Sequence, residues 1–73
     1  MKKTLYSKEH KYIIEKLKEA RANSGFDQIK VAKLLGRTQS EISKIEAGQR
    51  RIDIVQLKEF AKIYKKKLDY FIK

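Results

Sequence analysis

Three glycines and the absence of proline divide this sequence of 73 residues into short segments. Gly25, Gly36 and Gly48 each stand where an apolar periodicity typical of helices breaks off. Glycine readily adopts the left-handed conformation that follows the last residue of many helices, and proline would interrupt the segments between them. Within each segment apolar residues recur every three or four positions, so the chain is predicted to be all-α with four or five helices.

Residues that favour helix starts precede the apolar positions of each segment. Ser7, Asp27 and Asp53 are predicted to cap the first, second and fourth helices by accepting a backbone N–H. Thr38 precedes the third helix and Glu41 follows three residues later, which is the pattern of a capping box. The predicted inward residues are Ile13, Ile14, Leu17, Ala20 and Arg21; Val31, Ala32, Leu34 and Leu35; Ile42, Ile45 and Ala47; Ile54, Leu57, Phe60, Ala61 and Tyr64; and, in a last turn, Leu68, Phe71 and Ile72.

The composition limits how such a chain is stabilised. It has no Cys and one His, so neither disulfides nor a structural zinc site are expected, and no cofactor is predicted. Nothing resembles a paired acid and base, a nucleophile with its base, or a metal-binding set, so an enzyme is not expected. The length fits one domain, predicted to span residues 7–73 after a flexible arm of residues 1–6.

The charge indicates the kind of partner. Nineteen Lys and Arg against nine Asp and Glu give a formal net charge of +10, which suits a polyanion such as nucleic acid. A well-solvated basic surface explains the same numbers without a partner. No apolar stretch approaches the roughly 20 residues needed to span a bilayer, and a cytoplasmic protein is expected.

The spacing around the second and third helices is typical of two helices joined by a tight turn. Counting from Gln28, the small residue Ala32 is fifth, Gly36 ninth, Ile42 fifteenth and Ile45 eighteenth. Ala32 lets two helices approach closely, Gly36 can take the positive φ of a sharp turn, and the two isoleucines anchor the third helix. The opposite face of that helix must therefore point outward.

These residues carry a resemblance to a known family. Leu17–Phe71, and above all Gln39–Arg51, resembles the phage repressor and Cro-like helix-turn-helix family, also called the XRE family. The resemblance implies a compact four- to five-helix, lambda-repressor-like fold with the third helix in the DNA major groove. It also implies a partly buried ion pair between Arg21 and Glu46.

The outward face of the third helix is the predicted reading surface. With Ile42 and Ile45 inward, Gln39, Ser40, Ser43 and Lys44 lie outward at positions i, i+1, i+4 and i+5. Gln39 can pair with adenine and Lys44 with guanine, and the resemblance places base readers at Gln39, Ser40 and Lys44. Glu41 can accept from cytosine or cap its helix, and capping is the simpler role.

Contacts to the DNA backbone are expected from other residues. The resemblance implies a phosphate contact for Gln28, at the start of the second helix. The further predicted phosphate contacts are Thr38, Ser43, Arg50 and Arg51, and contact with a base or the minor groove is an alternative for Arg50.

Two departures from the family pattern bear on assembly. Lys65–Lys67 replaces a turn that usually contains glycine, so the fourth helix is expected to run on further; Ile52 stands where many members have proline. One such domain covers a half-site, so a homodimer on a palindromic operator in double-stranded DNA is expected. The candidate dimer residues are Ile54, Tyr70, Phe71 and Ile72.

The sequence therefore predicts a sequence-specific transcriptional regulator of the repressor or controller type. One alternative is an antitoxin-type module that binds a protein partner as well as its operator. Another is a non-specific nucleic-acid binder that uses charge alone, for which affinity would respond to salt but not to base sequence.

Overall fold

The computed structural model describes residues 8–72, and every regular element in that range is helical. Within these residues, the α-helices α1 (Lys8–Ser24), α2 (Gln28–Leu35), α3 (Gln39–Glu46) and α4 (Ile54–Tyr64) are followed by a 3-10 turn, η2 (Leu68–Tyr70). The predicted arm of residues 1–6 and the cap at Ser7 lie outside the described residues. None of the helices in residues 8–72 combines the length and the apolar character needed to cross a membrane.

The predicted caps that fall within this range are present. The Asp27 carboxylate accepts from the Lys30 N–H at 2.8 Å, and Thr38 and Glu41 form the predicted capping box at the start of α3. Asp53 begins α4 in the same way, with Gln56 as its reciprocal partner. Each cap satisfies N–H groups that have no partner within the helix, so these residues fix where α2, α3 and α4 begin.

The four α-helices α1 to α4 end with the same pattern of backbone hydrogen bonds. The residue that takes the left-handed conformation in this pattern is glycine in three of them and Lys65 in α4. In α4, the Lys66 N–H donates to the Ala61 carbonyl at 2.9 Å and the Lys65 N–H to Lys62 at 3.2 Å. This pattern requires a left-handed residue, and Lys65 takes that conformation with φ of 56°. The expectation that α4 runs on through the lysines is therefore wrong, because Lys65 replaces the usual glycine at some cost in backbone strain.

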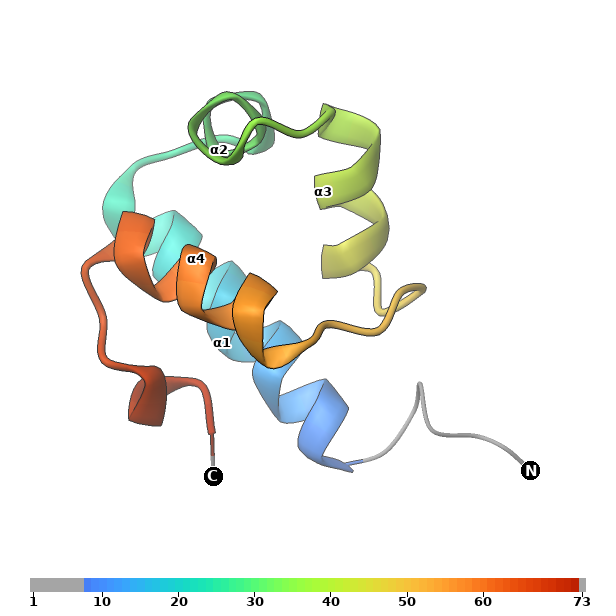
Figure 1. Ribbon diagram of the computed structural model, residues 1–73, viewed down its shortest axis with the longest axis vertical. Coiled ribbons are helices and arrows are strands. Elements are labelled where there is room, and N and C mark those ends of the chain that lie inside the picture. The colour runs from blue at the N-terminus through green and yellow to red at the C-terminus, as the bar shows by residue number, and fades with distance from the viewer. Residues whose placement is uncertain (1–7, 73) are drawn as a thin grey trace.

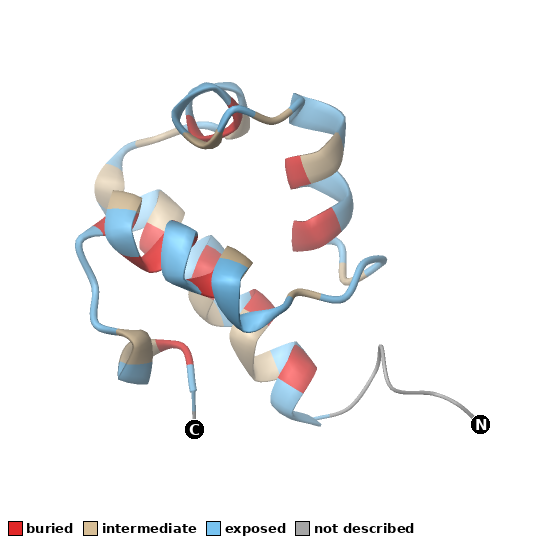
Figure 2. Ribbon diagram, in the orientation of Figure 1, coloured by how far each residue is buried: buried red, intermediate tan, exposed pale blue. Residues whose placement is uncertain are grey.

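The core lies between the four helices. In Figure 1, α1 and α4 pack against each other on one side, while α2 and α3 stand together above and beside them. Figure 2 shows that the buried parts of α3 and α4 face this common interior. The buried apolar side chains are Ile14, Leu17, Ala20, Val31, Ala32, Ile42, Ile45, Leu57, Phe60, Ala61, Tyr64 and Phe71.

Four residues predicted to face inward are exposed instead: Leu34, Ala47, Ile54 and Ile72. Leu34 is 46% exposed. Consecutive residues of a helix point about 100° apart, and in α2 it is the neighbouring Leu35 that packs against the core. Ile54 is 51% exposed, since it is the first residue of α4 and stands at the edge of the core. Ala47 is exposed because α3 ends at Glu46, before the helical periodicity reaches it.

The C-terminal turn returns to the core and changes the set of candidate dimer residues. Phe71 is fully buried, so its prediction as a dimer residue is wrong: η2 turns its side chain inward. Tyr70 is half-buried and packs edge-on to Phe71, and its ring lies 4.9 Å from Lys16 Nζ and 4.8 Å from Lys66 Nζ. Of the four candidates, only Ile54 and Ile72 are exposed.

The backbone of Lys65 yields a test of the fold. Lys65→Gly should raise the free energy of unfolding by about 0.5–1 kcal/mol, because relief of the left-handed strain exceeds the added entropy of the unfolded chain. For a domain of this size the midpoint of thermal unfolding should rise by a few degrees. Lys67→Gly is the matched control: Lys67 has φ of −75°, so glycine there should destabilise. Equal effects at the two positions would contradict the assigned conformation.

Candidate nucleic-acid interface

The helices α2 and α3 form a compact pair joined by a turn of three residues. The view in Figure 1 looks down the axis of α2, whereas α3 runs from top to bottom in the plane of the picture, so the two helices cross steeply. Gly36 makes the turn possible with φ of 67°, and the Arg37 N–H donates to the Ala32 carbonyl at 2.8 Å. Ala32 is itself buried, as expected for a small residue where two helices cross.

The two sides of α3 differ in burial and in chemistry. Ile42, Ile45 and Glu46 are buried on the side that faces the rest of the domain. The four residues predicted to lie outward, Gln39, Ser40, Ser43 and Lys44, are all exposed. The structure thus places one carboxamide, two hydroxyls and one ammonium group on a single helix face, and these groups can donate to or accept from the edges of base pairs.

The ion pair that the resemblance implied is present between α1 and the end of α3. Arg21 Nε lies 2.7 Å from Glu46 Oε2 and Arg21 Nη2 lies 3.0 Å from Glu46 Oε1, which is a bidentate arrangement. Arg21 Nη1 also donates to the Phe26 carbonyl at 3.2 Å. The Glu46 side chain is 4% exposed and that of Arg21 is 24% exposed. The hydrogen bond to Glu46 raises the pKa of the Arg21 guanidinium, so this group stays charged.

Gln28 takes part in the same cluster, which sequence reasoning did not foresee. Its Nε2 donates to Glu46 Oε1 at 3.0 Å, and its Oε1 accepts from Gln39 Nε2 at 3.2 Å. Gln28 and Glu46 are 18 positions apart, so only the packing of α2 against α3 brings them together. The amide predicted to contact a phosphate therefore also connects the buried ion pair to the first residue of the outward face.

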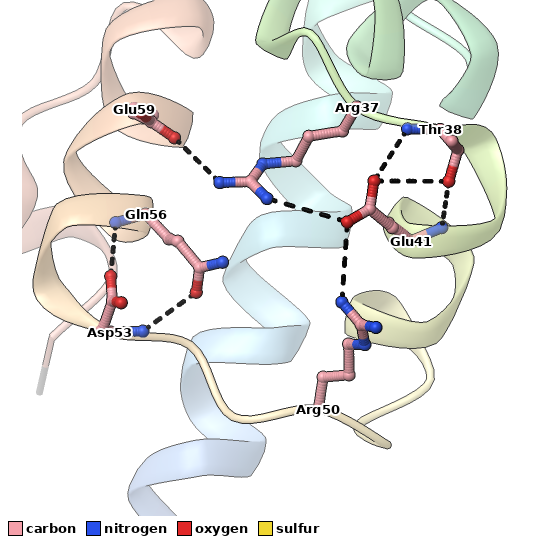
Figure 3. Close-up of polar contacts among 7 residues, drawn as sticks. All are labelled: Arg37, Thr38, Glu41, Arg50, Asp53, Gln56 and Glu59. Carbon is pink, nitrogen blue, oxygen red and sulfur yellow. Dashed lines mark hydrogen bonds and ion pairs between the residues drawn. The ribbon is translucent and has the colours of Figure 1, made fainter.

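A second cluster surrounds Glu41 at the other end of α3 (Figure 3). Glu41 Oε1 accepts from the Thr38 N–H at 3.0 Å, and the Thr38 hydroxyl accepts from the Glu41 N–H at 3.2 Å. The predicted capping role of Glu41 is thus confirmed. Its Oε2 also lies 3.8 Å from Arg37 Nη1 and 3.7 Å from Arg50 Nη1, and Arg37 Nη2 lies 3.5 Å from Glu59 Oε1 in α4.

The two arginines predicted to contact phosphates lie in the loop between α3 and α4. Arg50 and Arg51 are both exposed, and the Arg50 side chain reaches back to Glu41. The loop begins with the same pattern of hydrogen bonds that ends the other helices: the Gln49 N–H donates to the Lys44 carbonyl at 3.0 Å around Gly48. The end of α3 thereby fixes where this basic segment leaves the helix.

Comparison with known proteins agrees with this geometry. A family model described as "Helix-turn-helix" matches residues 17–71, which is most of the chain. The protein therefore belongs to the XRE/Cro-like helix-turn-helix family and is a DNA-binding regulator. No curated protein matches the chain.

The Arg21–Glu46 pair should be more important for stability than the surface ion pairs. Arg21→Met leaves a buried carboxylate without its partner and should lower the free energy of unfolding by about 2–3 kcal/mol. The double variant Arg21→Met/Glu46→Leu removes both charges and should be less destabilised than Arg21→Met alone. Glu59→Gln, at an exposed pair, should change stability by less than about 0.5 kcal/mol. Urea unfolding measures these three variants and Glu46→Leu alone, and additive effects of Arg21→Met and Glu46→Leu would contradict the pairing.

Glu41 should make stability depend on acid pH. The hydrogen bond from the Thr38 N–H is the main cause that lowers the pKa of Glu41 below its ordinary 4.5, and Arg37 and Arg50 act in the same direction. A lowered folded-state pKa gives a contribution that is present above the unfolded value and is lost as pH falls through the folded value. Glu41→Gln keeps a capping residue but cannot titrate. The stability difference between wild type and Glu41→Gln should shrink below about pH 4.5, and a constant difference from pH 7 to pH 3 would exclude this role.

Proposed function

We propose that this protein is a sequence-specific transcriptional regulator of the repressor or controller type that binds a palindromic operator as a homodimer. The observation that supports the proposal best is the two-sided character of α3. Ile42, Ile45 and Glu46 anchor one side, and only polar side chains occupy the other. An α-helix of this kind fits the major groove of B-DNA, where each base pair presents a distinct pattern of donors and acceptors.

The reading residues are Gln39, Ser40 and Lys44. A carboxamide can pair with adenine through one acceptor and one donor, and an ammonium group can donate to both acceptors of guanine. Gln39 is the first residue of α3, and Lys44 lies more than one turn further along, so the two side chains reach different base pairs. The Ser40 hydroxyl can donate or accept, and it adds less discrimination.

Affinity that does not depend on sequence comes from groups around this face. Thr38, Ser43, Arg50 and Arg51 are exposed and flank the reading residues, and we assign them to phosphate contacts. Gln28 has a second N–H beyond the one donated to Glu46, and this group is available to a phosphate. The net charge of +10 supports such binding, because each phosphate neutralised releases a counterion.

The homodimer follows from the size of the reading surface. One α3 covers a half-site, and two copies related by a two-fold axis read half-sites about 34–36 Å apart on one face of the duplex. Ile54 and Ile72 are 51% and 45% exposed and remain candidates for the contact between copies. Val55, next to Ile54, is 62% exposed and enlarges the apolar surface at the start of α4.

Selection from a random DNA pool with the purified protein, followed by binding measurements at several salt concentrations, tests the proposal. Wild type should yield a palindromic consensus. Lys44→Ala should lose discrimination at one position of each half-site by about 1–3 kcal/mol, because it removes a base contact. Arg51→Ala should weaken binding to all sequences about equally and reduce the salt slope by about one unit.

Each result has a clear contrary outcome. Tight, salt-sensitive binding without a consensus would replace the proposal with non-specific nucleic-acid binding through charge. If Lys44→Ala and Arg51→Ala both lower affinity uniformly, α3 does not read bases in the proposed way.

A further inference from the structure

A surface groove lies between the end of α2 and the second half of α4. Its volume is about 330 Å³, and the residues that line this α2–α4 groove are Leu34, Leu35, Glu59, Lys62 and Ile63. Leu34 is 46% exposed, and Leu35 and Ile63 are half-buried, so three of the five lining side chains present apolar surface to solvent. Covering such surface with an apolar group is favourable, and the volume is at the lower limit of pockets that bind ligands.

The rim of the α2–α4 groove is basic. Lys62 lines the groove, and Lys58 lies one helical turn before it in α4. In α2, Lys33 precedes Leu34 and Lys30 lies one turn before it. All four lysines are exposed, and within residues 8–72 no carboxylate forms an ion pair with any of them. Their charge is therefore open to a partner.

The carboxylate among the lining residues does not offset this charge. Glu59 Oε1 lies 3.5 Å from Arg37 Nη2, so an arginine already compensates it. The exposed lysines then leave a positive potential around an apolar surface. A molecule that covers the groove must bring apolar groups to its centre and negative charges to its rim.

These properties argue against two simple occupants. A second copy related by a two-fold axis would place the same patch against itself, so that the lysines of one copy would face those of the other. Duplex DNA would satisfy the lysines, but its charged backbone gains nothing from an apolar centre. In Figure 1 the second half of α4 and α3 also lie on opposite sides of the view, so the groove is separate from the outward face of α3.

We propose that the α2–α4 groove binds an acidic amphipathic helix of another protein, with one or two apolar side chains against Leu34 and carboxylates against the lysines of the rim. Every regular element of residues 8–72 is helical, so this part of the chain offers no strand edge to an extended peptide, whereas a groove between helices accepts a helix. The small groove fits a weak, transient contact. The inference does not depend on the proposed role of α3 in reading DNA.

Titration of the ¹⁵N-labelled protein with a designed peptide tests the proposal. The probe is a helical peptide of about 16 residues of Ala and Glu, with Leu at two positions four apart. Amide chemical shifts should change saturably at the end of α2 and in the second half of α4, and not on the outward face of α3. Peptides with Ser in place of both Leu, or Lys in place of every Glu, should bind at least about tenfold more weakly. These two peptides leave the protein itself unchanged.

Variants of the protein separate the groove from general stickiness and charge. Leu34→Ala should weaken binding of the acidic peptide at least about fivefold, whereas Ile29→Ala, at a 52% exposed position of α2 outside the groove, should not. Lys62→Glu should also weaken it at least about fivefold. Lys18→Glu makes the same change of charge beside a separate pocket near Gly48, and should weaken it less than about twofold at physiological salt. Circular dichroism confirms that each variant is folded.

Each contrary outcome is distinct. No saturable change at the groove up to about 1 mM peptide would overturn the inference, and so would equal binding of the peptide without Leu, which would indicate attraction by charge alone. Shift changes at the groove on adding duplex DNA, or on concentrating the protein by itself, would assign the groove to DNA or to a second copy instead. Failure to select a DNA consensus would overturn the proposed function and leave this inference standing.

Discussion

The ion pair between Arg21 and Glu46 is the interaction on which the arrangement of α3 depends. Glu46 is the last residue of α3, where the helix dipole is negative and a carboxylate is unfavourable. It is also buried, which adds the cost of removing a charge from water. Two N–H groups of Arg21 and one of Gln28 compensate both effects. Because these donors come from α1 and α2, the pair fixes the end of α3 relative to both helices.

Glu41 lies at the opposite end of α3 from Glu46. It lies in the first turn of α3, where a carboxylate interacts favourably with the dipole, and its partners are at the surface. Exposed ion pairs contribute little to stability, so this cluster mainly sets where α3 begins and how Arg50 lies next to it. One carboxylate thus holds each end of an eight-residue helix, and Ile42 and Ile45 hold its middle.

Local rules predicted the helix starts well, because a cap depends on residues only three positions apart. The inward isoleucines of α3 followed from periodicity, whereas the Arg21–Glu46 pair followed only from the family resemblance. Two features depended on packing and were missed. Lys65 takes a conformation that glycine usually supplies, and Gln28 contacts Glu46 and Gln39 of α3. Phe71 was predicted both to face inward and to lie in a dimer surface, and only the first prediction holds. Periodicity reports which face of a helix is apolar, but not which long-range neighbours complete a polar cluster.

The shortness of α3 connects stability to specificity. Isolated helices of fewer than about 12–15 residues are marginal in water, so the outward face of α3 exists only as long as the core and its two carboxylates hold it. A substitution that only weakens the core lowers the folded fraction and reduces binding to every sequence alike. Under the proposed function, a change in an outward side chain such as Lys44 alters instead which base fits, at a constant fraction of folded protein. Loss of affinity and change of preference are therefore physically separate consequences of substitutions that lie only a few residues apart.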